Sequence, residues 1–101
     1  MRICLVTGEY PPMEGGVGAF TRELGLALAD LGHEIHIVTT AQAAVRGSAQ
    51  EDELIVHRRI VRWDWRGIME AARCVRQVNP DVVNVQYEAA AYGLRAAVNL
   101  R

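Results

Sequence analysis

The sequence predicts an α/β fold of three layers, in which a mostly parallel sheet of about four strands lies between helices. Short runs rich in β-branched residues alternate with longer segments whose apolar residues recur every three or four positions. The short runs are apolar throughout, which is typical of parallel strands covered on both faces. The chain has 101 residues, half of them hydrophobic, so it is long enough for one domain with a core.

The amino-terminal part predicts one β-α-β unit. Ile3–Thr7 is an apolar run that predicts a strand, and Gly8–Gly18 predicts a loop because it holds two prolines and four glycines. Residues 17–31 have helical periodicity, and Gly32 suits the left-handed position after that helix. Glu34–Thr39 predicts the second, parallel strand. The helix is expected to bury one apolar stripe, consisting of Val17, Phe20, Leu24, Ala27 or Leu28, and Leu31.

The middle of the chain predicts a surface loop followed by a third strand. Ala41–Glu53 is polar and lacks periodicity, which indicates the loop. Leu54–Val61 predicts the strand. Its charged triplet, His57-Arg58-Arg59, favours a position at the edge of the sheet.

The last part predicts helix, strand and helix. Residues 65–78 predict a helix that ends before Asn79-Pro80, since the residue before proline avoids helical geometry. Asp81–Val85 predicts the fourth strand, Gln86–Glu88 a turn, and Ala89–Leu100 a third helix. The expected buried stripe of the middle helix is Trp65, Ile68, Met69, Ala72, Val75 and Val78.

The expected strand order is 3-2-1-4, which leaves the apolar fourth strand at an exposed edge. The sequence also ends directly after the expected third helix, before any strand that this helix would lead to. Two explanations remain open at this point: the chain is part of a longer polypeptide, or the exposed edge pairs with a second copy.

Composition excludes several functional classes. The net charge is −1, so a broad basic surface for nucleic acid is not expected. All eleven basic residues are arginine, which excludes a P-loop lysine or a lysine Schiff base. Cys4 and Cys74 lie in apolar patterns and are expected to be buried thiols in a reducing compartment. Without a signal segment or an apolar run of about 20 residues, a cytoplasmic protein is expected, with contact at a membrane surface left open.

A ligand is expected at the carboxyl ends of the strands, between the first and the fourth. There Glu14-Gly15-Gly16-Val17-Gly18 leads into a helix, whose free N–H groups suit a phosphate or diphosphate. The alternative is a glycine turn that only begins the helix. The dinucleotide pattern GxGxxG is absent and so is the Walker lysine, so neither a standard NAD site nor a standard ATP site is expected.

Several of these segments together resemble one family. The chain is similar to the amino-terminal part of family 4 (group 1) retaining glycosyltransferases. The resemblance spans nearly the whole chain, and residues 41–60 are its least informative part. The resemblance includes the first strand from Met1 to Val6, and Leu24 and Ala27-Leu28 of the helix. Its other motifs are Glu9-Tyr10-Pro11-Pro12, Gly15-Gly16-Val17-Gly18, Gly32-His33-Glu34-Ile35-His36-Ile37-Val38-Thr39 and Asp81-Val82-Val83-Asn84-Val85-Gln86.

The resemblance implies the incomplete, Rossmann-like amino-terminal half of the two-domain GT-B architecture. Residues 1–101 would form the acceptor-side domain, while the donor-binding domain and its paired glutamates would lie outside this chain. The implied reaction moves a sugar from a nucleotide-sugar donor, such as a UDP- or GDP-sugar, to an acceptor hydroxyl with retention. It implies no metal, no cofactor and no catalytic residue within this chain, which alone is expected to be inactive.

The resemblance also implies two sets of binding residues. Donor-phosphate contacts are expected from Gly15, Gly16 and Val17. Acceptor contacts are expected from Tyr10, Glu14, Gln86, Tyr87 and Glu88.

Four of these five acceptor assignments have a structural alternative. Tyr10 can pack against the neighbouring prolines, Glu14 can be a solvated loop residue, and Tyr87 with Glu88 can form an ordinary strand-to-helix turn. Family members often have histidine where this chain has Asn84 and Gln86, and amides can bind a sugar hydroxyl but cannot titrate.

Other charged residues are expected to have structural roles. His33 and His36 lie near the start of the second strand, away from the cleft. Basic residues around Trp63 and Trp65 predict a solvated, partly ion-paired edge, or contact with an anionic lipid or acceptor. They are His57, Arg58, Arg59, Arg62 and Arg66. The alternative to an enzyme is a stand-alone module that binds phosphate or sugar, or that dimerises through its sheet edge, without catalysis.

Overall fold

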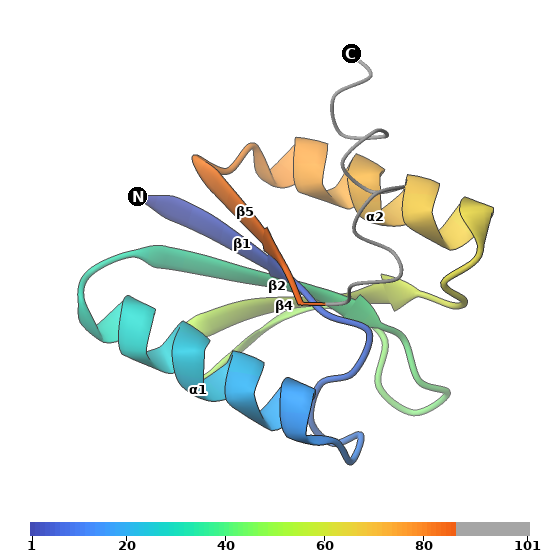
Figure 1. The fold of residues 1–101 in the computed structure, drawn as a ribbon, viewed down its shortest axis with the longest axis horizontal. Coiled ribbons are helices and arrows are strands. Elements are labelled where there is room, and N and C mark those ends of the chain that lie inside the picture. The colour runs from blue at the N-terminus through green and yellow to red at the C-terminus, as the bar shows by residue number, and fades with distance from the viewer. Residues whose placement is uncertain (87–101) are drawn as a thin grey trace.

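The computed structural model describes residues 1–86, which form five strands and two helices. Their order along the chain is β1 (Arg2–Val6), α1 (Gly16–Asp30), β2 (Glu34–Thr40), β3 (Gly47–Glu51), β4 (Leu54–Ile60), α2 (Trp65–Val78) and β5 (Val82–Val85). The sheet order is β3-β4-β2-β1-β5. All neighbouring pairs are parallel except β3 with β4. The two helices cover opposite faces of the sheet (Figure 1).

The predicted α/β class and mostly parallel sheet are confirmed, with one strand more than expected. The predicted order 3-2-1-4 is found as β4-β2-β1-β5, and β3 is added beside β4. The prediction of a loop over Ala41–Glu53 is therefore wrong for residues 47–51, and β4 is not an edge strand. The expected third helix, Ala89–Leu100, lies outside the described residues.

β3 has no hydrophobic pattern, and its pairing with β4 is what stabilises it as a strand. Its residues are exposed or half-buried, and it pairs with β4 in antiparallel register through a turn at Asp52, whose φ is 56°. Ser48 Oγ lies 2.7 Å from His57 Nδ1, and Glu51 accepts from Arg58. The polar triplet of β4 is thus paired with polar partners, which is why it does not mark an edge.

The core consists of two clusters, one on each face of the sheet. The first lies between the sheet and α2, and the second between the sheet and α1. The apolar runs of β1, β2 and β4 supply buried residues to both clusters, as expected for strands covered on two faces. β5 is the last strand on its side among the described residues, and Val82 and Val83 are 41% and 36% exposed.

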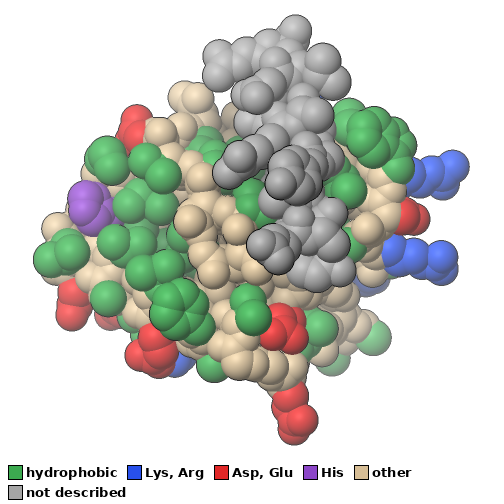
Figure 2. All heavy atoms as spheres, in the orientation of Figure 1, with side chains coloured by type: hydrophobic (Ala, Val, Ile, Leu, Met, Phe, Trp, Pro, Cys, Tyr) green, Lys and Arg blue, Asp and Glu red, His purple; other side chains and the backbone are tan. Residues whose placement is uncertain are grey.

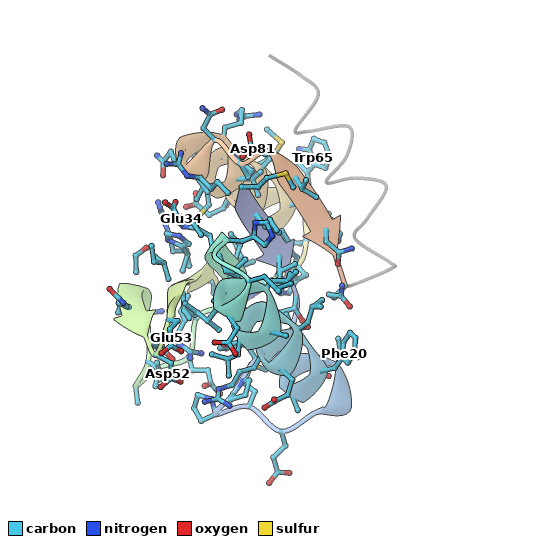
Figure 3. The ribbon with its side chains drawn as sticks, turned by 90° about the vertical axis from the view of Figure 1, so that its left-hand side faces the viewer. Phe20, Glu34, Asp52, Glu53, Trp65 and Asp81 are labelled. Atoms are coloured by element: carbon cyan, nitrogen blue, oxygen red, sulfur yellow. The ribbon has the colours of Figure 1, made fainter. Side chains whose placement is uncertain are left out.

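The predicted buried stripe of α1 is confirmed for Leu24 and Leu28, which pack against the core, and is wrong for Val17, Phe20 and Leu31. Val17, Phe20 and Leu31 are 44%, 59% and 75% exposed, whereas the buried residues of the helix are Gly18, Thr21 and Gly25. Small residues let α1 approach the sheet closely, and Leu24 and Leu28 pack beside them. Phe20 instead projects outward from the helix (Figure 3).

The bounds of α2 match the prediction, and polar caps fix both ends. Asp64 accepts a hydrogen bond from the Gly67 backbone N–H at 3.0 Å. Asn79 ends the helix in the left-handed conformation, with φ 53°. Trp65 was expected in the buried stripe, but it is 62% exposed because it precedes the part of the helix that meets the sheet.

Both cysteines are free and buried, as predicted. Burial is the main cause that raises the pKa of Cys4 to about 12, with Cys74 nearby adding to it. Burial also raises the pKa of Cys74.

Candidate functional site

A pocket of about 360 Å³ opens where β1 and β5 end, at the place where parallel sheets bind ligands. The loop after β1 forms one side of it, and the start of α1 forms the next. Hydrophobic side chains also reach the surface on the side of the molecule that carries α1 and β5 (Figure 2). The pocket is lined by Thr7, Gly8, Glu9, Met13, Val17, Trp63 and Gln86.

Three strands hold the loop after β1 in place. Thr7 Oγ1, at the end of β1, donates to the Glu9 carbonyl at 2.8 Å. Thr40 Oγ1, in β2, donates to the Gly8 carbonyl at 2.6 Å. Arg58 Nη2, in β4, donates to the Pro11 carbonyl at 2.7 Å. The loop is therefore bound to the sheet at its beginning and its middle.

Arg58 is a buried anchor and not part of an exposed basic surface. Its side chain is only 3% exposed, and its guanidinium pairs with Glu51 at 2.8 Å. The guanidinium also lies 5.3 Å from the centre of the Tyr10 ring, within cation–π range. Period-two alternation turns Arg58 to the α1 face of the sheet and its neighbour Arg59 to the α2 face. Arg58 is therefore not part of the predicted solvated basic edge.

Tyr10 lies beneath the loop. It is 2% exposed and packs in the cluster between the sheet and α1. It is not among the residues that line the pocket. Burial is the main cause that raises its pKa. Glu14 is exposed and does not line the pocket either.

The glycine-led start of α1 already faces a carboxylate. Glu9 Oε1 accepts from the Val17 backbone N–H at 3.2 Å, so a negative group lies where the helix dipole favours one. Gly15 has φ 154°, and a Cβ there would come within 2.2 Å of the Glu9 carboxylate. At Gly16 no described atom lies within 4 Å of an added Cβ, so this side of the helix start is open.

Trp63 forms the wall of the pocket on the β4 side, in the connection between β4 and α2. Its Nε1 donates to Thr40 Oγ1 at 2.8 Å, and the same hydroxyl donates to Gly8. One threonine thus ties the indole to the loop after β1.

Glu9 and Trp63 are the site residues that sequence reasoning missed. The sequence signal available for Glu9 is its position as an acidic residue between the first strand and a helix that begins with glycines. For Trp63 the sequence showed only an aromatic residue among arginines, with no sign that it faces the end of β1.

Of the expected acceptor residues, Gln86 lines the pocket. Its backbone N–H donates to the Val6 carbonyl at 2.7 Å, which extends the pairing of β1 with β5. Its side-chain amide donates to Asn84 Oδ1. Tyr87 and Glu88 lie outside the described residues.

The histidines do not line this pocket. His33 Nδ1 lies 3.0 Å from the amino terminus, and His36 lies between Glu34 and His57, at 2.7 Å and 2.9 Å. Burial, with His36 and Arg59 nearby, lowers the pKa of His57 to about 4.

Within residues 1–86, no three or more histidine, cysteine or carboxylate side chains are grouped as a metal site would require. Over the same residues, neither helix combines the length and apolar character needed to cross a membrane.

Comparison with protein families identifies the family of the chain. The family model described as Glycosyltransferase Family 4 matches residues 14–101, which is most of the chain and includes the start of α1. No curated protein matches the sequence.

Proposed function

We propose that this chain, which belongs to glycosyltransferase family 4, is the acceptor-side part of an enzyme that transfers a sugar from a nucleotide-sugar to an acceptor hydroxyl with retention. The observation that carries the proposal is the pocket at the ends of β1 and β5, directly beside the open start of α1. Acceptor and donor phosphate would meet between these two features.

The open side of Gly16 is where we place the donor phosphate. A β-carbon at this position would meet no described atom, so a ligand can come close to the backbone. The Val17 N–H, by contrast, is bound to Glu9. A phosphate that takes this N–H has to replace the Glu9 carboxylate, because two negative groups at one donor repel each other.

The pocket itself suits the acceptor better than the phosphate. The Glu9 carboxylate makes it unfavourable for an anion and favourable for a hydroxyl that donates a hydrogen bond. The Gln86 side chain adds an amide oxygen on the β5 side. We propose that Gln86 binds the acceptor, together with Tyr87 and Glu88 from the following segment.

The whole enzyme would need a second domain that binds the nucleotide and supplies the reacting groups. No catalytic residue is proposed within this chain. The proposed location is the cytoplasm.

The experiment measures transfer by the complete enzyme that contains this chain, as nucleotide release from UDP- and GDP-sugars, for the wild type, Gly16→Val and Ala19→Val. Ala19→Val is the matched control, because Ala19 is exposed in the same turn of α1 and does not line the pocket. We expect Gly16→Val to lose about tenfold or more in kcat/KM, which is the cost of one misplaced positioning contact, while Ala19→Val keeps its activity. Both variants should unfold at similar temperatures.

Equal transfer by the two variants would remove Gly16 from the donor site. Absence of transfer from every donor, with the protein folded, would contradict the enzyme proposal and favour a binding module without catalysis.

A further inference from the structure

A row of polar side chains crosses the α2 side of the sheet from β3 to β1. Ser48 Oγ of β3 lies 2.7 Å from His57 Nδ1 of β4, and His57 Nε2 lies 2.9 Å from His36 Nδ1 of β2. His36 Nε2 lies 2.7 Å from Glu34 Oε2, which also accepts from Arg2 Nε of β1 at 2.6 Å. Each side chain of the row is therefore within hydrogen-bond distance of the next.

The two imidazole rings meet edge to edge. Their planes differ by 5°, and their centres are 5.2 Å apart. Because the facing nitrogens are only 2.9 Å apart, the ring centres can be that far apart only if both nitrogens lie close to the line between them. One nitrogen therefore points its hydrogen at the lone pair of the other, and His36 and His57 share one hydrogen.

Glu34 sets the direction of the row when both histidines are neutral. Hydrogen bonds from His36 and Arg2 lower the pKa of Glu34, so its carboxylate is ionised and can only accept. His36 then carries its hydrogen on Nε2 and accepts at Nδ1. His57 in turn carries its hydrogen on Nε2, and its Nδ1 accepts from the Ser48 hydroxyl.

One added proton fits into this row without the loss of a hydrogen bond. A proton on His57 Nδ1 makes that nitrogen a donor to Ser48 Oγ, which can accept as well as donate. The N–H···N bond between the rings and the bond to Glu34 remain. A second proton would place hydrogens on both facing nitrogens and bring two cations together at 2.9 Å.

Charged groups of the neighbouring elements also act on the pair. Arg59 of β4 disfavours a cation at His57, and Glu70 of α2 binds that arginine at 3.1 Å. β3 adds no charged side chain on this face. Burial, with His36 and Arg59 nearby, lowers the pKa of His57 to about 4, as expected if the second proton is hard to add. Further charged or titratable groups on this side of the sheet are Arg2 and Cys4 of β1, Glu34 of β2, and Arg73 and Cys74 of α2.

The geometry points to a proton-sensitive attachment of β3 to the sheet: the pair of His36 and His57 takes up one proton with its hydrogen bonds intact, reverses its bond to Ser48, and loosens β3 when a second proton is added. His36 is 8% exposed and bound to Glu34, so the second proton displaces the half-buried His57. β3 then loses its contact at Ser48, and it has no apolar pattern that would replace this contact. This attachment is independent of sugar transfer.

The first measurement is NMR of the full chain with ¹⁵N-labelled histidine. Above neutral pH we expect both rings of the pair as Nε2–H tautomers, with a scalar coupling between His36 Nδ1 and His57 Nε2 across their hydrogen bond. The coupling should survive the first proton and vanish as pH falls toward 4, where His57 becomes charged. His33→Gln is the control and should leave this pattern unchanged, because His33 contacts the amino terminus.

The second measurement is amide hydrogen exchange, expressed as protection factors so that the intrinsic effect of pH is removed. Protection of β3 should fall about tenfold as pH falls toward 4, the size expected for the loss of one hydrogen bond, while β1 stays protected. Ser48→Ala should lower the protection of β3 already at neutral pH and abolish the further step. Gln50→Ala is the matched control and should keep the step, because Gln50 lies on the same face of β3 and bonds to the Asp52 carbonyl.

His36→Gln tests the pair itself. Glutamine can accept from His57 and donate to Glu34, so the row is kept but two facing cations cannot form. We expect the midpoint of His57 to rise above about 4 and β3 to stay protected at that pH.

Three results would overturn the inference: no coupling between the two rings at any pH, equal protection of β3 at neutral pH and at about pH 4, or the same step in Ser48→Ala as in Gln50→Ala. The coupling and the protection of the wild type decide the matter if a variant does not fold.

Discussion

Arg58 and Glu51 form an ion pair, and we predict that removing one side chain destabilises the fold more than removing the other. Arg58 is 3% exposed, whereas Glu51 is 37% exposed. Removing Glu51 leaves a cation inside the protein with no negative partner among the described residues that contact it. Removing Arg58 leaves a carboxylate that water can reach. We therefore expect Glu51→Ala to cost more stability than Arg58→Met.

The magnitudes follow from these contacts. Glu51→Ala leaves the buried guanidinium without its carboxylate partner, which lowers the free energy of unfolding by about 3–5 kcal/mol. Arg58→Met leaves the Pro11 carbonyl without its donor, at a cost of about 1–3 kcal/mol, while the methionine keeps most of the buried volume. Arg59→Met is the matched control, since this neighbour is 34% exposed and pairs with Glu70 at the surface. Its cost should be about 0–1 kcal/mol.

The assay is urea unfolding at neutral pH, followed by circular dichroism, for the wild type and the three variants. An equal slope against urea shows that differences in midpoint are differences in stability. The reasoning is refuted if Arg58→Met is less stable than Glu51→Ala, or if Glu51→Ala cannot be distinguished from Arg59→Met.

Three further predictions concern single groups. The pKa of His57 is lowered from 6.5 to about 4, so the stability that this group contributes is present above about pH 6.5 and is lost as pH falls toward 4. Its imidazole signals in NMR should titrate near pH 4, and a midpoint near 6.5 would contradict its burial. The pKa of Cys4 is raised from 9.0 to about 12, so the stability that this thiol contributes is present below pH 9 and is lost as pH rises toward 12. A maleimide reagent at pH 8 should not label Cys4 until urea unfolds the protein, and rapid labelling of Cys4 in the native protein would refute this. In Gly67→Ala the new Cβ would lie 1.5 Å from the Arg62 carbonyl oxygen, so thermal unfolding should show a loss of about 1–3 kcal/mol in stability. Gly16→Ala is the control and should change stability little. Equal melting temperatures for the two variants would show that the start of α2 can shift without cost.

Local pattern was sufficient for the elements that bury apolar side chains along their length. The strands at β1, β2 and β4, and the helix α2 with its stop at Asn79, all follow from spacing, composition and the geometry of residues before proline. The pairing of β1 with β5 followed from the rules of parallel sheets. These rules also indicated the place of the pocket, because the ends of parallel strands meet at one edge.

Local pattern was not sufficient where a contact distant in the sequence decides the outcome. β3 has no apolar alternation, and its structure comes from pairing with β4. The closest approaches of α1 are made by Gly18, against the backbone of Glu9 and Tyr10, and by Gly25, against side chains of the sheet. No periodicity rule measures these distances, so the sequence does not predict that small residues are needed there.

The sequence by itself determined the class of fold, the order of the parallel strands and the family, because these depend on which residues are apolar and on a few motifs. Only the tertiary structure decided that Arg58 is buried beneath the loop and that Trp63 faces the end of β1. The alternation of β4 sets the placement of Arg58, since neighbouring residues of a strand point to opposite faces, and the hydrogen bond to Thr40 of β2 holds Trp63 in the connection after β4. A charge or an aromatic ring therefore acquires its role from the strand opposite it and not from its neighbours in the chain.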